Sequence, residues 1–291
     1  LNTIELSLIA VDSQGKVRNG DRSKVELALS PQTHQAVVAN GFRLLTRLEL
    51  PPGRYQLRVA ARESGGLVGS VPYDLVVPDY AKEPLTMSGL LVSSASSAMT
   101  PTARPDEQLK DVLSGPPSVV RDFVQADTLS LFAEIYDNDA GTPHRVDIVT
   151  TITGDNGRQV FKTEDERSSS ELQGARGGYG YTAQIPLRDI APGRYLLRVE
   201  ARSRLRGDAP VARETEIRVY GVRPAAAAAP APAGKVIVPG ERGPVSGITA
   251  YREAVARTAE EWEALWKALP ARRPMPKVSF ENTMIAGLFL G

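Results

Sequence analysis

The sequence LPPGRYQLRVAAR at residues 50–62 returns as IAPGRYLLRVEAR at residues 190–202. In both copies a Pro-Gly pair, which favours a turn, precedes a strict alternation of apolar and polar residues. The apolar residues of the first copy fall at every second position: Tyr55, Leu57, Val59 and Ala61. This alternation predicts a half-buried antiparallel strand in each copy, with arginines on the side that faces water.

Each copy places a tyrosine two residues after the glycine of its turn. Tyr55 follows Gly53, and Tyr195 follows Gly193. A tyrosine at this place is typical of the tyrosine corner of immunoglobulin-like sandwiches, in which the hydroxyl bonds to the backbone upstream. We expect Gly53 and Gly193 to form the turns because glycine tolerates positive φ.

Short alternating runs, separated by turn signals every 8–15 residues or so, predict a mainly β chain. We expect two antiparallel sandwiches of the immunoglobulin or fibronectin type III kind, over residues 1–80 and 83–221. Within the first, Ser30-Pro31 predicts the start of a short helix and Gly41 its end. The second is expected to contain a long Ser/Thr/Pro-rich loop near residues 93–117.

A different composition follows the second predicted sandwich. Residues 222–243 are rich in alanine and proline, which predicts a semi-rigid linker. Residues 244–291 predict a truncated α+β domain, in which a capping box at Thr258 opens an amphipathic helix that carries Trp262 and Trp266. The two tryptophans are expected to be core residues of that helix.

The composition excludes several classes of protein. The 291 residues include 35 basic and 34 acidic side chains, a balance that argues against nucleic-acid binding. The absence of cysteine excludes disulfides and thiolate chemistry. No apolar run reaches the roughly 18 residues that a membrane helix requires. The chain opens on Leu1 without a visible signal peptide and ends on an apolar strand, so we expect a fragment at both ends.

Catalytic residues are hard to find in this sequence, which contains two histidines, His34 and His144. A Ser-His-Asp triad would have to join His144 to Ser168, Ser169 or Ser170, and no Gly-x-Ser-x-Gly motif supports it. A metal site of the zinc type lacks ligands as well. We therefore expect exposed or capping histidines, with no catalytic residues, cofactor or metal.

Two polar features allow a binding role. The run Asp137-Asn138-Asp139 could offer oxygens to calcium, although a hairpin turn in which these side chains bond their own backbone is favoured. Arginines of the two repeated strands could bind an acidic polymer. Interspersed glutamates favour cross-strand pairing on an exposed sheet face instead. These arginines are Arg54, Arg58, Arg62, Arg194, Arg198, Arg202, Arg204 and Arg206.

Five segments together carry a resemblance to a known family: Leu50–Arg62, Val71–Asp79, Glu134–Asn138, Phe161–Arg167 and Pro192–Arg204. They resemble the region C-terminal to the von Willebrand factor A domain in the VWFA-related proteins of acidobacteria, over about residues 1–221. In that family the A domain carries an Asp-x-Ser-x-Ser metal site, which has no counterpart in this sequence. The resemblance therefore implies accessory β domains of a cell-envelope or secreted protein, without the metal role.

The C-terminal region carries a second resemblance. Residues 246–291, with TAEEWEALW and the closing AGLFLG, look like the start of the C-terminal domain of the protease-complex subunit PrcB. This resemblance implies a non-catalytic partner of a surface protease.

The sequence thus predicts a non-enzymatic, extracytoplasmic module that serves as a spacer and a protein-interaction surface. Its expected partner is another protein, such as a protease or an envelope component. Two alternatives stay open. One is a hydrolase or carbohydrate-active protein with an unrecognised site, and the other is a scaffold that oligomerises through the open strand edge of Met284–Leu290.

Overall fold

The computed structural model describes the residues 2–66, 68–97, 100–103, 109–139, 142–172, 179–205, 210–221 and 283–290. They form two compact units. Among the described residues, the first unit comprises 2–34 and 48–78, and the second comprises 35–47, 79–221 and 283–290. None of the helices in these ranges has the length and apolar character needed to cross a membrane.

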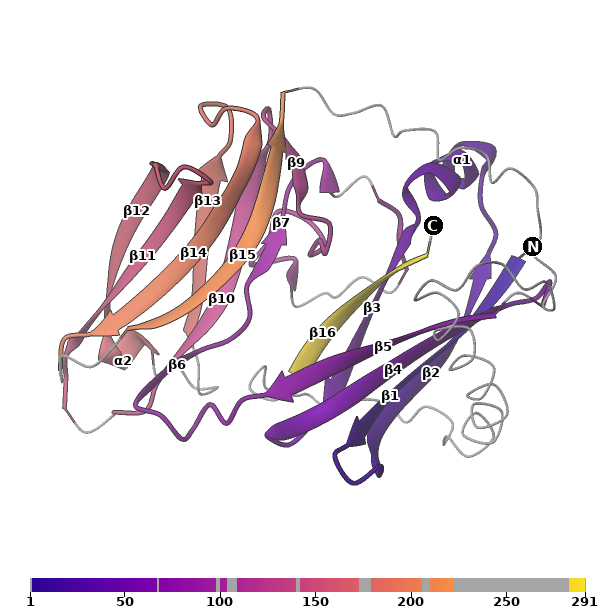
Figure 1. The fold of residues 1–291 in the computed structure, drawn as a ribbon, viewed down its shortest axis with the longest axis horizontal. Coiled ribbons are helices and arrows are strands. Elements are labelled where there is room, and N and C mark those ends of the chain that lie inside the picture. Colours follow the sequence, from indigo (N-terminus) through magenta and orange to yellow (C-terminus); the bar gives the residue numbers. More distant parts are fainter. Residues whose placement is uncertain are drawn as a thin grey trace. The chain divides into compact units, whose positions relative to one another are not determined.

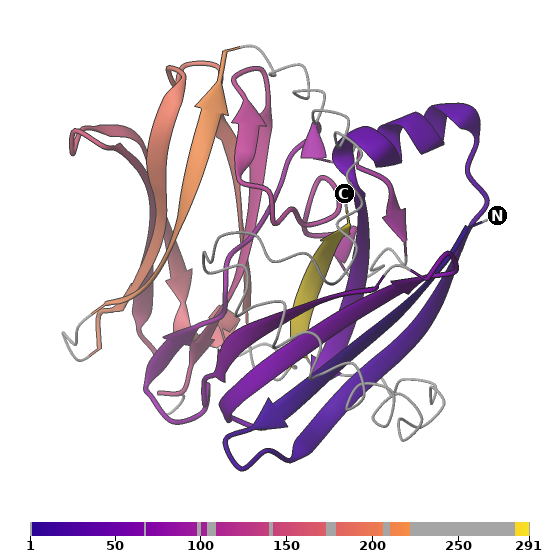
Figure 2. The same cartoon turned by 45° about the vertical axis from the view of Figure 1, so that its right-hand side comes forward.

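The first unit contains one four-stranded antiparallel sheet, with the strand order β2-β1-β4-β5 (Figure 1). Its strands are β1 (Asn2–Asp12), β2 (Val17–Leu27), β4 (Gly53–Glu63) and β5 (Val68–Val77). The strong twist of this sheet is visible in Figure 2. The Asp12 carboxylate fixes the β1–β2 hairpin because it accepts hydrogen bonds from the amides of Gln14 and Lys16, each 2.9 Å long.

Burial in this sheet follows the predicted alternation only in part. Tyr55 and Leu57 of β4 are buried as expected, but further along the strand Ala60 is buried and its neighbours are half-buried. β1 is buried on both faces from Leu6 to Val11.

The predicted domain of residues 1–80 is divided differently in the structure. The helix α1 (Pro31–Asn40) begins after a Ser30 hydroxyl that accepts from the Thr33 amide, and it ends before Gly41, whose φ is 69°. The next strand, β3 (Phe42–Glu49), leaves the first sheet and lies between β8 (Thr102–Ala103) and β16 (Thr283–Leu290). β3 therefore pairs with strands that are distant in the sequence, and it does not join the sheet of its predicted domain.

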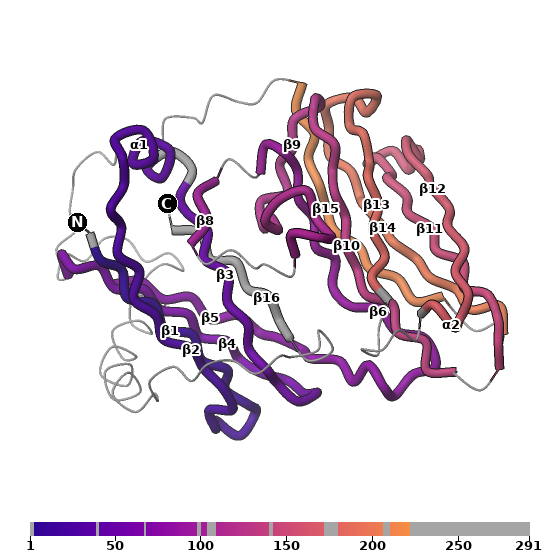
Figure 3. The backbone as a smooth tube through the Cα atoms, turned by 180° about the vertical axis from the view of Figure 1, so that it is seen from behind, coloured from indigo at the N-terminus to yellow at the C-terminus, as the bar shows by residue number. Residues whose placement is uncertain are grey.

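The second unit contains a two-sheet sandwich, whose layers can be followed in Figure 3. One sheet has the order β13-β10-β6, with β7 also paired to β10, and the other has the order β12-β11-β14-β15-β9. The bounds are β6 (Leu85–Met87), β7 (Leu91–Ser93), β9 (Asp122–Val124), β10 (Thr128–Asp137), β11 (Arg145–Gly154), β12 (Gln159–Ser168), α2 (Ser169–Leu172), β13 (Tyr179–Pro186), β14 (Gly193–Ser203) and β15 (Val211–Tyr220).

Both sheets of the sandwich contribute to one hydrophobic core. Leu131 and Ile135 of β10 are fully buried in it together with Ile148 of β11 and Leu197 of β14. A polar link crosses this core, because the hydroxyl oxygens of Thr150 and Tyr181 lie 2.9 Å apart and are both buried. The mainly β prediction is confirmed, while the immunoglobulin-like identity of the sandwiches stays a prediction.

The segment 93–117 is less loop-like than its composition suggests. β7 ends at Ser93, β8 lies inside the segment, and Leu109 and Leu113 are buried. The predicted linker, residues 222–243, and the predicted helix with Trp262 and Trp266 lie outside the described residues.

Candidate functional site

The two tyrosines of the repeated sequence have the same local geometry. The Tyr55 hydroxyl donates to the carbonyl oxygen of Pro51 at 2.8 Å, and the Tyr195 hydroxyl donates to that of Ala191 at 2.7 Å. Both rings are buried. Each ring therefore closes the turn that precedes its own strand.

The two glycines act differently from the prediction. Gly193 does not adopt positive φ, and Gly53 has a φ of 159°, close to extended backbone. A Cβ added at either glycine would lie 3.4 Å from the ring of the tyrosine two residues later. The glycines thus provide a flat backbone surface on which the ring lies.

The Asp137-Asn138-Asp139 run does not form the predicted hairpin turn, because it begins the connection from β10 to β11, which belong to different sheets. Asp137 is buried, and its Oδ1 accepts from the Asp139 amide at 3.1 Å, which is the self-bonding expected of such a turn.

Asn138 binds a neighbouring segment and not its own turn. Its Nδ2 donates to the carbonyl oxygens of Tyr80 and Glu83, both at 2.7 Å, and its amide donates to that of Pro84 at 2.7 Å. The Tyr80 ring also packs against Tyr136, with 4.8 Å between the ring centroids. Burial raises the pKa of the Tyr80 hydroxyl. We call the segment Asp79–Pro84 the strap.

The side chain of His144 is buried, and the expectation of an exposed or capping histidine is wrong for this residue. Its side chain is 5% exposed, and Nε2 lies 3.1 Å from Oδ2 of Asp137, whose side chain is 1% exposed. Neither atom has a hydrogen-bond partner of good geometry among the described residues. Nδ1 lies 2.8 Å from the carbonyl oxygen of Thr142.

The geometry around His144 does not assemble a catalytic triad. Ser169 Oγ accepts from the backbone amide of His144 at 3.1 Å, while the ring nitrogens face Thr142 and Asp137. The hydroxyls of Ser168 and Ser170 lie 2.9 Å from one another. In a Ser-His-Asp triad the serine hydroxyl contacts a ring nitrogen of the histidine, and none of the three serines has that contact here. The other histidine, His34, is exposed on α1.

Calcium-type coordination is not formed by this turn either. Asp137 Oδ2 faces His144, and the Asn138 side chain is turned toward backbone carbonyls. Within the described ranges no three side chains of His, Asp or Glu converge as metal ligands.

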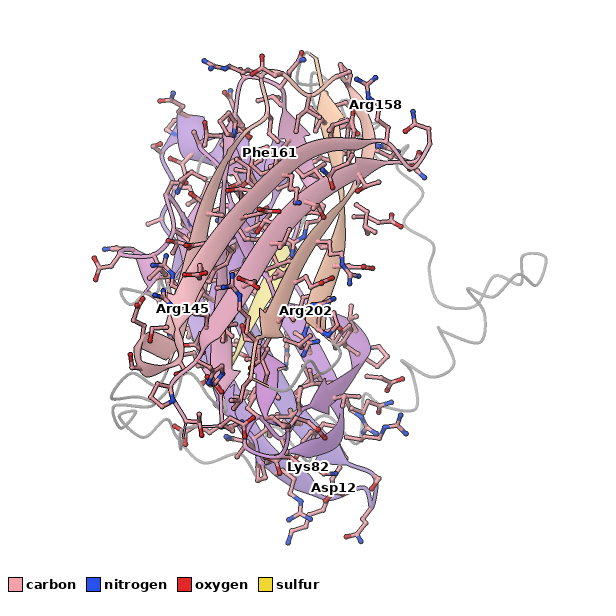
Figure 4. All side chains as sticks on the ribbon, turned by 90° about the vertical axis from the view of Figure 1, so that its left-hand side faces the viewer. Asp12, Lys82, Arg145, Arg158, Phe161 and Arg202 are labelled. Atoms are coloured by element: carbon pink, nitrogen blue, oxygen red, sulfur yellow. The ribbon has the colours of Figure 1, made fainter. Side chains whose placement is uncertain are left out.

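The outer face of the β12-β11-β14-β15 strands carries equal numbers of basic and acidic residues, as the strand registers place them. They are Arg145, Lys162, Arg194, Arg198, Arg202 and Arg218 with Asp147, Glu164, Glu166, Glu200, Glu214 and Glu216. We call this surface the charged face. Figure 4 labels Arg145 and Arg202 on it.

Ion pairs connect neighbouring strands across the charged face. Arg198 pairs with Glu200 at 2.8 Å and with Glu214 on the next strand, and these bonds raise its pKa. Arg204, just beyond β14, binds Asp147 at 2.5 Å, and this hydrogen bond lowers the pKa of the Asp147 carboxyl. Arg145, Lys162 and Arg202 also pair with carboxylates. The arrangement favours cross-strand pairing over an acidic-polymer site, because most of the basic groups already have carboxylate partners. Arg206 lies outside the described residues.

Arg43 is a buried cation that the sequence analysis did not single out. Its residue is 1% exposed, and burial lowers its pKa. Nη2 donates to the carbonyl oxygen of Ser97 at 3.0 Å, and Nη1 lies 3.4 Å from both the Pro116 carbonyl oxygen and the Thr102 hydroxyl. Arg43 therefore joins β3 to the segment 93–117. In the sequence it looks like any polar residue of an alternating strand.

β5 exposes large apolar side chains at a sheet edge. Val68, Val71, Tyr73 and Val76 are 63%, 54%, 62% and 60% exposed. The register places Val71 and Tyr73 beside Val59 and Leu57, so the buried face of the sheet continues into solvent at this strand. Among the described residues β5 pairs with β4 alone. Val68 and Val76, which pair with Arg62 and Arg54, lie on the opposite face of the sheet. We call Val71 and Tyr73 the β5 apolar patch.

Comparisons with known proteins do not identify a family. The chain matches no protein-family model and no curated protein. Among solved structures it is similar to Bacteroides uniformis β-glucuronidase 2, with 13% identity and a TM-score of 0.32, over 75% of this chain and 24% of that one. It is also similar to dimeric latent PorU from Porphyromonas gingivalis, with 17% identity and a TM-score of 0.27, over 58% of this chain and 12% of that one. The chain thus spans a quarter or less of these two structures, and such distant similarities say nothing about its function.

Proposed function

We propose that this chain is a non-enzymatic, extracytoplasmic β module that acts as a spacer and as a protein-interaction surface. In line with the resemblance of residues 1–221, it would be the accessory region of a VWFA-related protein of the cell envelope or of a secreted protein. Its partner is another protein.

The observation that carries this proposal is the β5 apolar patch. Clustered apolar side chains at an exposed edge are typical of surfaces that bind other proteins. Pro72 lies in the middle of this strand. Proline is tolerated in a strand where its nitrogen faces the free edge, where it also blocks pairing with a further strand. The patch is therefore suited to contact through side chains and not to unlimited strand addition.

The geometry around His144 is consistent with a binding role, and so is the charged face, whose basic and acidic residues balance. Among the described residues, no serine hydroxyl contacts a ring nitrogen of His144, and most cations of the charged face are paired with carboxylates. A neutral, internally paired face resists non-specific adhesion to polyanions, which suits a spacer.

The test is capture of envelope proteins of the source organism by the chain, compared with a variant carrying Val71→Ser and Tyr73→Ser. The matched control carries Val119→Ser and Val120→Ser, two exposed valines of the second unit. We expect a discrete captured protein that only the β5 variant loses. Equal capture by all three proteins would contradict the proposal, as would hydrolysis of glycoside or peptide substrates that a single serine or histidine substitution abolishes.

A further inference from the structure

The first copy of the repeated sequence carries arginines that have no carboxylate partner. Arg54, Arg58 and Arg62 lie at every fourth position of β4 and therefore on one face of the sheet. Arg54 and Arg62 are exposed, and Arg58 donates through Nε to the Gln56 side chain at 2.8 Å. Among the described residues none of the three arginines forms an ion pair. We call these three side chains the β4 arginine row.

The second copy shows which residue is missing from the first. On β14, Glu200 pairs with Arg198 at 2.8 Å and with Arg202 at 3.6 Å. The residue at the same place in the first copy is Ala60, which is buried. The cations of the β4 arginine row therefore lack the acceptor that neutralises their counterparts on β14.

Two carboxylates lie on the same face of the sheet as the row. The register places Glu5 of β1 beside Arg62, and it places Asp74 of β5 beside Gln56. Neither carboxylate forms an ion pair with the row in the described part of the chain. A guanidinium group binds carboxylates through two parallel hydrogen bonds and is more weakly hydrated than an ammonium group. The row is therefore available to the carboxylates of another molecule.

An apolar residue of the edge strand β5 lies opposite each arginine of the row. In the order of Arg54, Arg58 and Arg62, these residues are Val76, Pro72 and Val68. Val68 and Val76 are 63% and 60% exposed. The surface thus repeats a cation and an apolar side chain at every fourth residue, which is about 13 Å along the strand. An extended peptide has the same rise per residue, so its side chains can match this repeat.

We propose that the β4 arginine row and the apolar side chains beside it bind an extended acidic segment of another protein. The segment places a carboxylate over each arginine, at every fourth residue, and its neighbouring apolar side chains contact Val68 and Val76. The partner is the protein of the proposed function, on which this assignment rests, and the row specifies its chemistry. An acidic polysaccharide fits this surface less well, because it offers charge without apolar groups and three arginines would release few of its counterions.

The probe is a short synthetic peptide with glutamate at every fourth position and with valine and serine between the glutamates, titrated into the full chain by calorimetry. The control peptide has the same composition with its glutamates adjacent. We expect the spaced peptide to bind about fivefold or more tightly than the control, because its carboxylates reach all three arginines. Its affinity should fall about tenfold between about 50 mM and 500 mM salt, because salt screens exposed charges. Equal binding of the two peptides would overturn the proposal.

The repeated sequence supplies a matched pair of variants. Arg58→Gln with Arg62→Gln should weaken binding of the spaced peptide about fivefold or more, because two of its three cations are lost. Arg198→Gln with Arg202→Gln, the same changes in the second copy, should leave the affinity within about twofold, because those cations already have carboxylate partners. An equal loss in both variants would show that the peptide responds to overall charge and would refute the row.

A third variant, Val68→Ser with Val76→Ser, tests the apolar part of the surface. It should weaken the spaced peptide about threefold or more and leave the salt dependence unchanged, because it removes apolar area and no charge. A sulfated oligosaccharide that binds more tightly than the peptide would refute a protein segment as the occupant. If the arginine variant does not fold, as judged by circular dichroism, the valine variant and the two peptides still decide the question. Failure of the peptide to bind would refute the row, whereas capture that is lost with Val71→Ser and Tyr73→Ser would still support the proposed function.

Discussion

The hydrogen bond between Thr150 and Tyr181 offers a sharp test of the sandwich in the second unit. Thr150 lies on β11 and Tyr181 on β13, so the bond joins the two sheets through their core. Tyr181 is 2% exposed and Thr150 is fully buried. Tyr181→Phe or Thr150→Val removes one hydroxyl and leaves the other without its partner, with little change in volume.

Each single substitution should lower the free energy of unfolding by about 1–3 kcal/mol, because a buried hydroxyl is left unpaired. In the double variant no hydroxyl is left alone. We therefore expect the double variant to lose about 1–2 kcal/mol less than the sum of the two single losses.

The assay is urea unfolding followed by the methyl resonances of Ile148 and Ile152, two core residues of the same sandwich. Thr151→Val is the matched control, because Thr151 is the next residue of β11, points to the opposite face of the sheet and is only half-buried. Additive single losses, or a control that costs as much as Thr150→Val, would refute the cross-sheet bond.

The same tyrosine gives a pH dependence with a definite sign. Burial raises the pKa of Tyr181 above its usual value of 10.0. The folded state then retains a proton that the unfolded state releases. The contribution of Tyr181 to stability is therefore fully present below about pH 10, and it is lost as pH rises through the folded-state pKa. Tyr181→Phe should remove this part of the alkaline loss, measured as the slope of unfolding free energy with pH.

Three further predictions follow from other residues. Arg43→Met should lower the free energy of unfolding by about 3 kcal/mol or more in urea titrations, since the half-buried acceptors of Ser97, Thr102 and Pro116 lose a charged donor, and a loss below about 1 kcal/mol would contradict the role of Arg43 as an anchor. Gly180→Ala should cost about 1–3 kcal/mol, because the new Cβ would lie 2.7 Å from the ring of Phe132, and the paired variant with Phe132→Leu should recover part of that loss. Arg198→Ala should change unfolding free energy by less than about 1 kcal/mol at any salt concentration, because Arg198 and its partners Glu200 and Glu214 are all partly open to water, and a larger loss would show that the charged face stabilises the fold.

The sequence predicts the strands well where one face of the strand is buried and the other is exposed to solvent. The second sandwich has this arrangement, so period-two alternation locates β11 and β14. The signal is lost where both faces are covered. β1 is buried on both sides, and β3 is buried around Arg43, which alternation alone would direct toward water.

The candidate site was predictable in its residue types but not in its contacts. Asp137 and His144 are seven positions apart, and their pairing depends on a connection that crosses between the two sheets of the sandwich. The acidic run favours a hairpin turn, and a hairpin would not require a contact between Asp137 and His144. The useful signal is that a carboxylate at the end of one strand is followed by a histidine directly before the next strand.

The repeated turn-and-tyrosine sequence shows how far a local motif determines structure. Its two copies agree in the hydroxyl bond four residues upstream and in the contact of the ring with glycine. Their surroundings differ, because β4 belongs to a single four-stranded sheet and β14 lies within a two-sheet sandwich. Local bonds within five residues need no information from the rest of the fold, whereas the covering of the strand face depends on distant segments. A repeated motif therefore predicts the same turn at the start of each strand, and it does not by itself predict a repeated domain.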